Sequence, residues 1–223
     1  MEQRIDLGAP DLFPGLFFIY SDRMGMTVAI IGPARCGKSY LTAKLADHYG
    51  VPAFFEGEEP EFPPEIIEDL SKNIRPLERF LYFRNRSTLN QLEAGKLARK
   101  HRFVFLDTCW LTNPPWLDVY RTSPLEKELL SQLCETAARV LPWPGAVLYL
   151  TADLDTSRRL MSASGRGFDK YFNDAMVDSK ERFSRYMEKF SPQAPLISFD
   201  RSGADFDDPA TLQRIVDALE RIG

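Results

Sequence analysis

The chain has 223 residues, of which 44% are hydrophobic and 27% are charged. This is the composition of an ordinary globular protein whose core needs no disulfide or metal to hold it together. The net charge of −4 disfavours an extended nucleic-acid-binding surface, although it leaves a local basic groove open.

The first apolar stretch is LFPGLFFIY, residues 12–20. It is shorter than the roughly 20 residues that span a bilayer, and neither a basic leader nor a small-residue cleavage site accompanies it. We therefore expect residues 1–25 to be an N-terminal extension and residues 26–223 to form a single domain, with no association with a membrane.

The stretch TVAIIGPARCGKSYL, residues 27–41, has the pattern G-x-x-x-x-G-K-[ST]. Its glycines let the backbone turn tightly, so that successive N–H groups point at phosphate oxygens. Lys38 is expected to reach the β- and γ-phosphates of ATP, and the hydroxyl of Ser39 to bind Mg²⁺. The residues expected to bind ATP are Gly32, Pro33, Ala34, Arg35, Cys36, Gly37, Lys38, Ser39 and Tyr40.

The segments before and after this loop also fit a phosphate-binding loop, which lies between a strand and a helix. The apolar run before it predicts a buried parallel strand, and SYLTAKLADHYG after it predicts a short helix that ends at Gly50. The N-terminus of that helix adds a partial positive charge to the phosphate site.

The three cysteines, Cys36, Cys109 and Cys134, are odd in number and do not have the spacing of a metal site. In a nucleotide-binding protein this pattern favours reduced thiols and a cytoplasmic location.

Strand-like and helix-like segments alternate along the chain. The strand candidates are residues 27–32, 52–56, 103–107, 146–151 and 195–200. Helices are expected between them, among them 76–100, 123–141 with Ser123 as N-cap, and about 208–222 after Asp207 or Asp208. The alternation predicts an α/β fold in which a five-stranded parallel sheet has helices on both faces.

In such a sheet the site lies at the carboxyl ends of the strands. The second strand ends at Glu56, which is predicted to be the general base that takes the proton of an acceptor hydroxyl, although Glu58 and Glu59 compete for this role. The third strand ends at Asp107, which is predicted to lie near the metal ion, with a capping role as the alternative.

Residues 154–172, LDTSRRLMSASGRGFDKYF, place a basic turn between two helical segments. Glycines on both sides of Arg166 predict a mobile lid whose arginine contacts the transferring phosphoryl group. Arg158 and Arg159 are alternatives for this contact.

Together these motifs resemble the deoxynucleoside kinase family of P-loop kinases, from about Thr27 to the C-terminus. AFFEG is similar to the end of that family's second strand, and its glutamate falls on Glu56; LYLTADLDTSRRLMSASGR is similar to the strand, helix and lid, with Asp155 at the acidic position and Arg166 at the last arginine. The resemblance implies ATP and Mg²⁺ as cofactors, phosphorylation of the hydroxyl of a nucleoside, and a homodimer.

The chain also departs from that pattern. The arginine of the motif after strand three is absent from Asp107-Thr108-Cys109, and the first arginine of the lid motif is replaced by Ser164. The glutamine that holds the base falls near Arg79 or Phe80. Arg79 and Arg86 are therefore the predicted substrate-binding arginines, and we expect altered recognition of the base.

Other functions stay open at this point. The first half of the chain is also similar to the bacterial nicotinamide riboside kinase type, in which an Asp-Thr pair follows strand three. A kinase that acts on a hydroxymethyl pyrimidine in phage-type DNA is a further alternative, but the acidic stretch EGEEPEFPPE beside Glu56 disfavours a DNA backbone there. A nucleotide-binding subunit without catalysis is the alternative from another class of protein, favoured by the missing arginines.

Overall fold

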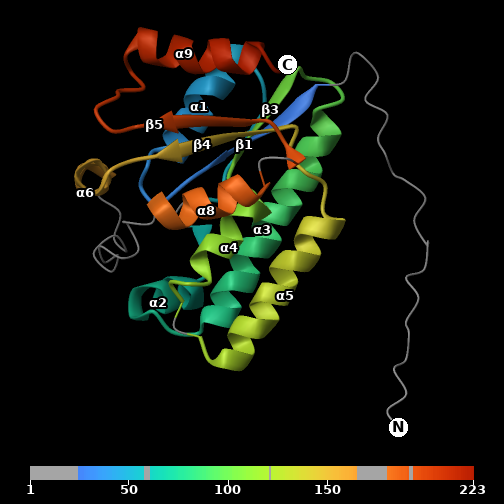
Figure 1. Cartoon of the computed structure of the whole chain (residues 1–223), viewed down its shortest axis with the longest axis vertical. Helices are drawn as coiled ribbons and strands as arrows, with labels where there is room; N and C mark the ends of the chain where they lie inside the picture. Colours follow the sequence, from blue (N-terminus) through green and yellow to red (C-terminus); the bar gives the residue numbers. More distant parts are fainter. Residues whose placement is uncertain (1–24, 58–60, 121, 165–179, 191–192) are drawn as a thin grey trace.

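The computed structural model describes residues 25–57, 61–120, 122–164, 180–190 and 193–223 (Figure 1). In the described part, five strands pair in parallel to form one sheet with the order β2-β3-β1-β4-β5. The strands are β1 (Met26–Ile31), β2 (Ala53–Phe54), β3 (Phe103–Asp107), β4 (Ala146–Thr151) and β5 (Leu196–Asp200). The predicted five-stranded parallel sheet of an α/β fold is confirmed.

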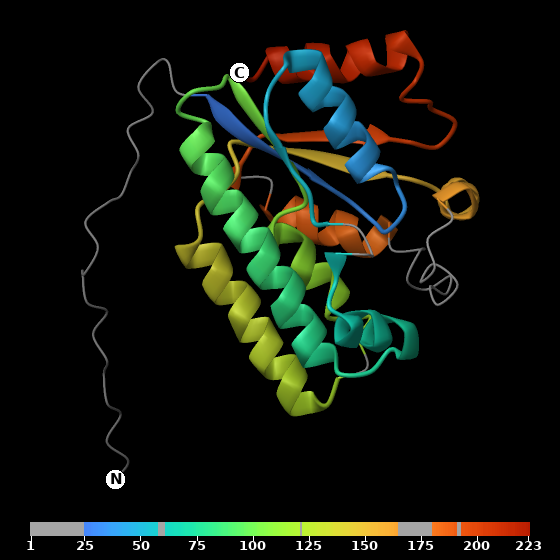
Figure 2. The same cartoon turned by 180° about the vertical axis from the view of Figure 1, so that it is seen from behind.

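Helices connect the strands. They are α1 (Lys38–Tyr49), α2 (Pro64–Lys72), α3 (Pro76–Leu97), α4 (Asn113–Trp116), α5 (Pro124–Val140), α6 (Leu154–Ser164), α8 (Lys180–Phe190) and α9 (Pro209–Glu220), with a 3₁₀ turn at Trp110–Thr112. Helices α1 and α9 cover one face of the sheet, and α3, α4, α5 and α8 lie on the other (Figures 1 and 2). The prediction of helices on both faces is therefore confirmed.

The sequence of β1 explains how one sheet serves two cores. Side chains alternate along a strand, so Val28 and Ile30 pack with α1 and α9, while Ala29 and Ile31 pack with α3, α5 and α8. All four are fully buried. A strand that is covered on both faces needs a continuous apolar run, and TVAII supplies it.

The predicted ends of the helices are mostly found where the sequence places them. Ser123 caps α5 in a capping box with Glu126, and Gly50 ends α1 in a left-handed conformation with φ 63°. Of the two aspartates proposed to cap the last helix, Asp208 does so, accepting from the backbone N–H groups of Ala210 and Thr211. The predicted helix 76–100 is shorter than expected and ends at Leu97.

The second strand is the clearest difference. A strand was expected over 52–56, but β2 covers only Ala53–Phe54, so Glu56 lies in the loop beyond it. β2 is an edge strand with β3 as its single neighbour in the described sheet. Beyond Phe54 the next backbone carbonyl, that of Phe55, accepts from Nδ2 of Asn90 at 2.9 Å, so α3 binds the chain where the ladder with β3 stops.

The helices of the described part include none that is both long and apolar enough to cross a bilayer. The predicted N-terminal extension, residues 1–25, lies outside the described residues except for Gly25.

Candidate active site

A cavity of about 600 Å³ lies where β1, β2 and β3 end. This volume is within the usual range for a small-molecule site. The predicted site residues that line it are Gly32, Ala34, Arg35, Gly37, Lys38, Ser39, Tyr40, Glu56, Arg79 and Asp107. The structure thus brings together residues from three strand ends and one distant helix.

The loop between β1 and α1 has the backbone of an anion cradle. Gly32 has φ 154°, and a Cβ atom there would lie 2.2 Å from the carbonyl oxygen of Leu150, so no other residue fits. Gly37 precedes α1 with φ 90°. Lys38 donates from Nζ to the carbonyl of Pro33 at 2.8 Å, which holds the ammonium group across the loop.

Two residues of the predicted ATP-binding loop do not line the cavity. Pro33 and Cys36 are buried, and Cys36 packs in the core beneath the loop. Burial raises the pKa of the Cys36 thiol above its ordinary value. The thiol is therefore neutral, so Cys36 would contact a nucleotide through its backbone N–H. Pro33 has no N–H, and its carbonyl oxygen accepts from Lys38.

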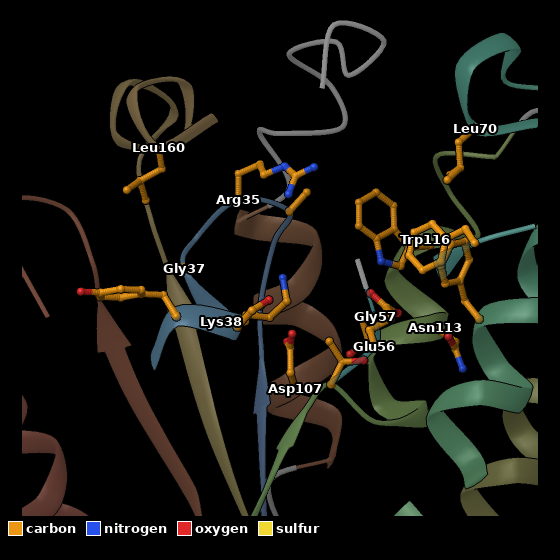
Figure 3. A pocket seen from close by; sticks show the side chains of 18 of the residues that line it. Arg35, Gly37, Lys38, Glu56, Gly57, Leu70, Asp107, Asn113, Trp116 and Leu160 are labelled. Atoms are coloured by element: carbon orange, nitrogen blue, oxygen red, sulfur yellow. The ribbon is translucent and has the colours of Figure 1, made fainter. Parts of the chain in front are cut away.

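Lys38, Asp107 and Glu56 point into one common space (Figure 3). Asp107 is 5% exposed at the end of β3, and Glu56 is half-buried. Thr108 follows Asp107 with φ 73°, a strained conformation for a β-branched residue. Such strain at the rim of a cavity is typical of functional sites.

The side of the cavity away from the loop has aromatic and apolar walls. They are formed by Phe62, Leu70, Phe80, Phe83, Trp116 and Tyr120, from α2, α3, α4 and the adjoining loops. Trp116 and Leu70 lie across the cavity from Arg35 and Leu160 (Figure 3). Flat apolar walls of this kind suit a planar ring.

Arg79 belongs to this wall and is only 1% exposed. Its Nη2 donates to Oδ1 of Asn73 at 2.8 Å, and its guanidinium carbon lies 5.0 Å from the centre of the Tyr120 ring. Its Nε and Nη1 have no hydrogen-bond partner in the described structure. Asp69 does not neutralise it, because that carboxylate forms its ion pair with Arg75 at 2.6 Å. Burial lowers the pKa of Arg79.

Arg86, the other predicted substrate-binding arginine, is placed differently. It does not line the cavity but donates from Nη2 to Glu61 at 2.7 Å, at the surface beside Gly57. The predicted lid arginine, Arg166, lies outside the described residues. Of its alternatives, Arg158 lies 3.7 Å from Asp155 on α6, and both arginines are exposed.

Sequence reasoning missed two residues that line the cavity next to the phosphate loop, Arg201 and Asp207. Arg201 follows β5 and is 6% exposed. Asp207 accepts hydrogen bonds from Tyr40 and Lys44, so it ties the loop after β5 to α1. The strand-end rule that selected Glu56 and Asp107 would also have selected Arg201, which directly follows the last residue of β5.

The described residues contain no group of three or more histidine, cysteine or acidic side chains that could by itself hold a metal ion. Ser39 and Asp107, the two residues predicted to bind the metal ion, both line the cavity. Such a sparse oxygen donor set fits Mg²⁺, which usually keeps several waters and takes phosphate oxygens as further ligands.

Comparisons with known proteins agree with this geometry. A curated relative, the deoxyadenosine kinase of Lactobacillus acidophilus, is 25% identical over 175 residues, which cover 76% of this chain and 80% of the relative. A structure of deoxyadenosine kinase from M. mycoides with the products dCMP and a flexible dCDP bound has a TM-score of 0.70 at 18% identity, covering 88% of this chain and 100% of that one. Another, with bound dATP, has a TM-score of 0.69 at 15% identity, covering 87% and 99%.

The resemblance to deoxynucleoside kinases that the sequence motifs indicate is therefore confirmed. The model of the AAA_28 family, described as an AAA domain, matches residues 27–185, which is more than half of the chain. The protein is a member of this AAA-domain family.

Proposed function

We propose that the protein is an ATP-dependent kinase that phosphorylates a hydroxyl group of a nucleoside. The observation that carries this proposal is the single cavity shared by the phosphate loop, the two carboxylates and an aromatic wall. The similarity to deoxyadenosine kinases supports the same activity. In this proposal the loop binds the phosphates of the donor nucleotide, and the aromatic wall packs against the base of the acceptor.

The chemistry follows from the placement of the charged groups. Glu56 accepts the proton of the acceptor hydroxyl as its oxygen bonds to the γ-phosphorus of ATP. The bond from that phosphorus to the β–γ bridging oxygen breaks, and ADP leaves with the electron pair. Lys38 and the N–H groups of the loop offset the negative charge that spreads over the phosphoryl oxygens.

Ser39 and Asp107 are the residues proposed to hold Mg²⁺, Asp107 directly or through water. The ion would offset charge on the β- and γ-phosphates when bound. Arg166 is proposed as the lid arginine that closes over the γ-phosphate. The backbone N–H of Cys36 and of the other non-proline loop residues is proposed to contact the nucleotide, and Pro33 is proposed to act through its carbonyl, which holds Lys38. Arg86 is left without a role at the acceptor because it pairs with Glu61.

The alternative activities are less well supported. A DNA acceptor requires a basic groove at the acceptor side, where the wall is aromatic and the neighbouring Glu61 and Glu65 are exposed acids. A subunit that only binds nucleotide would not need Glu56 and Asp107 beside the loop. Nicotinamide riboside shares the ribose hydroxyl and a planar ring with nucleosides, and it is therefore included in the experiment below.

An ADP-release screen tests the proposal. The purified protein is incubated with ATP, Mg²⁺ and each of the deoxynucleosides, ribonucleosides, nucleoside monophosphates, nicotinamide riboside and hydroxymethyl-pyrimidine DNA. Release of ADP with a nucleoside supports the proposed function. Release with the DNA substrate alone, or with none of the acceptors, contradicts it.

Arg79 is expected to select the base. Its free guanidinium donors require acceptor atoms, and guanine presents the adjacent acceptors O6 and N7, whereas adenine presents N7 beside an amino donor. Arg79 lines the cavity, and its Nε and Nη1 are buried and unpaired in the described structure. Because glutamine pairs with adenine, Arg79→Gln should shift the deoxyguanosine-to-deoxyadenosine ratio of kcat/KM towards adenine by about 5- to 150-fold.

The KM for ATP measured on the same Arg79→Gln variant should stay unchanged. Arg99→Gln is the matched control, since Arg99 is exposed just after the same helix and does not line the cavity. An unchanged ratio in a folded Arg79→Gln protein would remove Arg79 from base recognition.

A homodimer is also part of the proposal. Leu125, Leu129 and Val140 lie at helical spacing on α5, and Leu89 and Leu92 on the neighbouring α3, and all five are more than 40% exposed. A second copy is the expected partner of these apolar stripes. Leu129→Glu should weaken self-association by about 100-fold or more in analytical ultracentrifugation, because an unpaired buried carboxylate costs several kcal/mol.

Glu135→Gln, on the same helix, is the control for this dimer experiment. A native protein that is monomeric at tens of micromolar would rule the dimer out. We also propose a cytoplasmic location, which the three free and buried thiols of Cys36, Cys109 and Cys134 support.

A further inference from the structure

The guanidinium group of Arg201 stands at the phosphate side of the cavity. It lies against the phosphate loop, because a Cβ atom on Gly37 would be 3.6 Å from its Nε and 3.9 Å from its Cζ. Its Cζ is also 3.6 Å from the centre of the Phe206 ring, so the aromatic ring supports one side of it. Loop and ring together fix this cation beside the N-terminus of α1.

Asp205 lies near enough to Arg201 to raise its pKa, but no hydrogen bond or ion pair in the described structure explains the burial of the Arg201 side chain. Its side chain is 6% exposed, forms no hydrogen bond or ion pair within the described residues, and its Nε and Nη1 are buried without acceptors. Asp207 is close enough to feel its charge but forms its ion pair with Lys44. Asp205 accepts from the backbone N–H of Asp207 at 3.0 Å and pairs with no guanidinium nitrogen. The charge therefore lacks a carboxylate of its own.

On the side of the phosphate loop, the neighbours of Arg201 are positive. The loop holds Lys38, and the N-terminus of α1 carries a partial positive charge. Burial lowers the pKa of Arg201 from its ordinary value, and the charge of Asp205 opposes this shift in part. A buried cation without a partner, placed next to other positive groups, is costly unless an anion joins them.

We propose that Arg201 is a nucleotide-binding residue that donates hydrogen bonds to the phosphate groups of the donor nucleotide. A planar guanidinium edge pairs bidentately with phosphate oxygens, and the position beside Gly37 and Lys38 is where those oxygens would lie. Arg201 thus provides a positive charge on the β5 side of the site in a chain that lacks two of the arginines of its relatives' motifs. The inference rests on the proposed use of ATP.

The test compares binding of ATP, inorganic tripolyphosphate and adenosine by calorimetry without Mg²⁺, with the acceptor site saturated by the best acceptor of the screen so that adenosine reports on the donor site. Two variants separate the charge from the packing: Arg201→Met keeps an unbranched apolar side chain on Phe206, and Arg201→Lys keeps the charge but loses the planar fork. Arg201→Met should weaken ATP and tripolyphosphate by about 10- to 100-fold, the scale of hydrogen bonds to charged groups, and leave adenosine unchanged. Arg201→Lys should show a smaller loss of the same kind.

Arg214→Gln is the matched control, because Arg214 also lies over a phenylalanine ring, 5.2 Å from that of Phe199, but is exposed and outside the cavity lining. It should bind all three ligands like the native protein. Equal losses for ATP and adenosine would assign Arg201 to the base, and unchanged ATP affinity in both variants would make it a structural residue; either result overturns the inference. Failure of the native protein to bind ATP would instead refute the proposed function.

Discussion

Replacing Lys38 by alanine is expected to abolish phosphoryl transfer while leaving the fold intact. Lys38 is the first residue of α1, and its ammonium group is held at the mouth of the loop by the carbonyl of Pro33. Among the described residues, Lys38 is the lysine of the loop itself, and Arg201 approaches the phosphates from the other side, after β5. The loss should be about 10³-fold or more, the scale of removing a cation from a transferring phosphoryl group.

The measurement is a single-turnover rate with the best acceptor of the screen, together with a urea unfolding curve of the variant. Lys96→Ala is the control, because Lys96 is an exposed α3 lysine that pairs with Glu93 away from the cavity. Normal turnover by a folded Lys38→Ala protein would show that the loop is not the site of transfer. A control that is also inactive would point to a general effect of the substitution.

The phosphate loop could be predicted because the residues that determine its conformation all lie in one stretch of sequence. The apolar run of β1, the glycines of the loop and the glycine stop of α1 follow one another between Met26 and Gly50. Gly32 shows how strong that local signal is, since β4 approaches so closely that a side chain there would meet the carbonyl of Leu150. The alternation of strand-like and helix-like segments, which predicts the sheet, can likewise be recognised from short stretches of sequence.

The parts that could not be predicted depend on contacts between distant segments. β2 ends where the carbonyl of Phe55 accepts from Asn90 of the distant helix α3, which leaves Glu56 in a loop. Arg201 reads in the sequence as a polar loop residue after the last strand, and its burial follows only from its packing against Gly37 and Phe206. The same holds for the aromatic wall, because Phe80 and Phe83 look like the core side of an ordinary amphipathic helix.

The family pattern was not sufficient to predict the environments of Arg79 and Arg86. Both lie on α3, and both were expected at the acceptor. The structure turns Arg79 into the cavity wall with Asn73 and Tyr120, and turns Arg86 towards Glu61 at the surface. Residues seven apart on a helix point in similar but not identical directions. The neighbours that pack against each residue therefore decide its environment.

Glu56→Gln is expected to retain ATP binding and to lose about 10²- to 10⁴-fold in kcat, the usual contribution of a positioned proton acceptor. Glutamine keeps the size and polarity of the side chain but cannot take a proton. If Glu56 acts only when the acceptor hydroxyl loses its proton, the KM for the nucleoside should change by much less than kcat.

The control and the alternative both come from the same region of the chain. Glu65→Gln should be silent, because Glu65 is an exposed residue in the first turn of α2. Glu58→Gln tests the competing assignment, since Glu58 follows Glu56 closely in an acidic stretch. A large kcat loss in Glu58→Gln with a normal Glu56→Gln would transfer the base to Glu58. Equal losses of kcat/KM and ATP affinity in Glu56→Gln would instead show that the carboxylate holds the metal–nucleotide complex, as Asp107 is proposed to do, and that the proton leaves by another route.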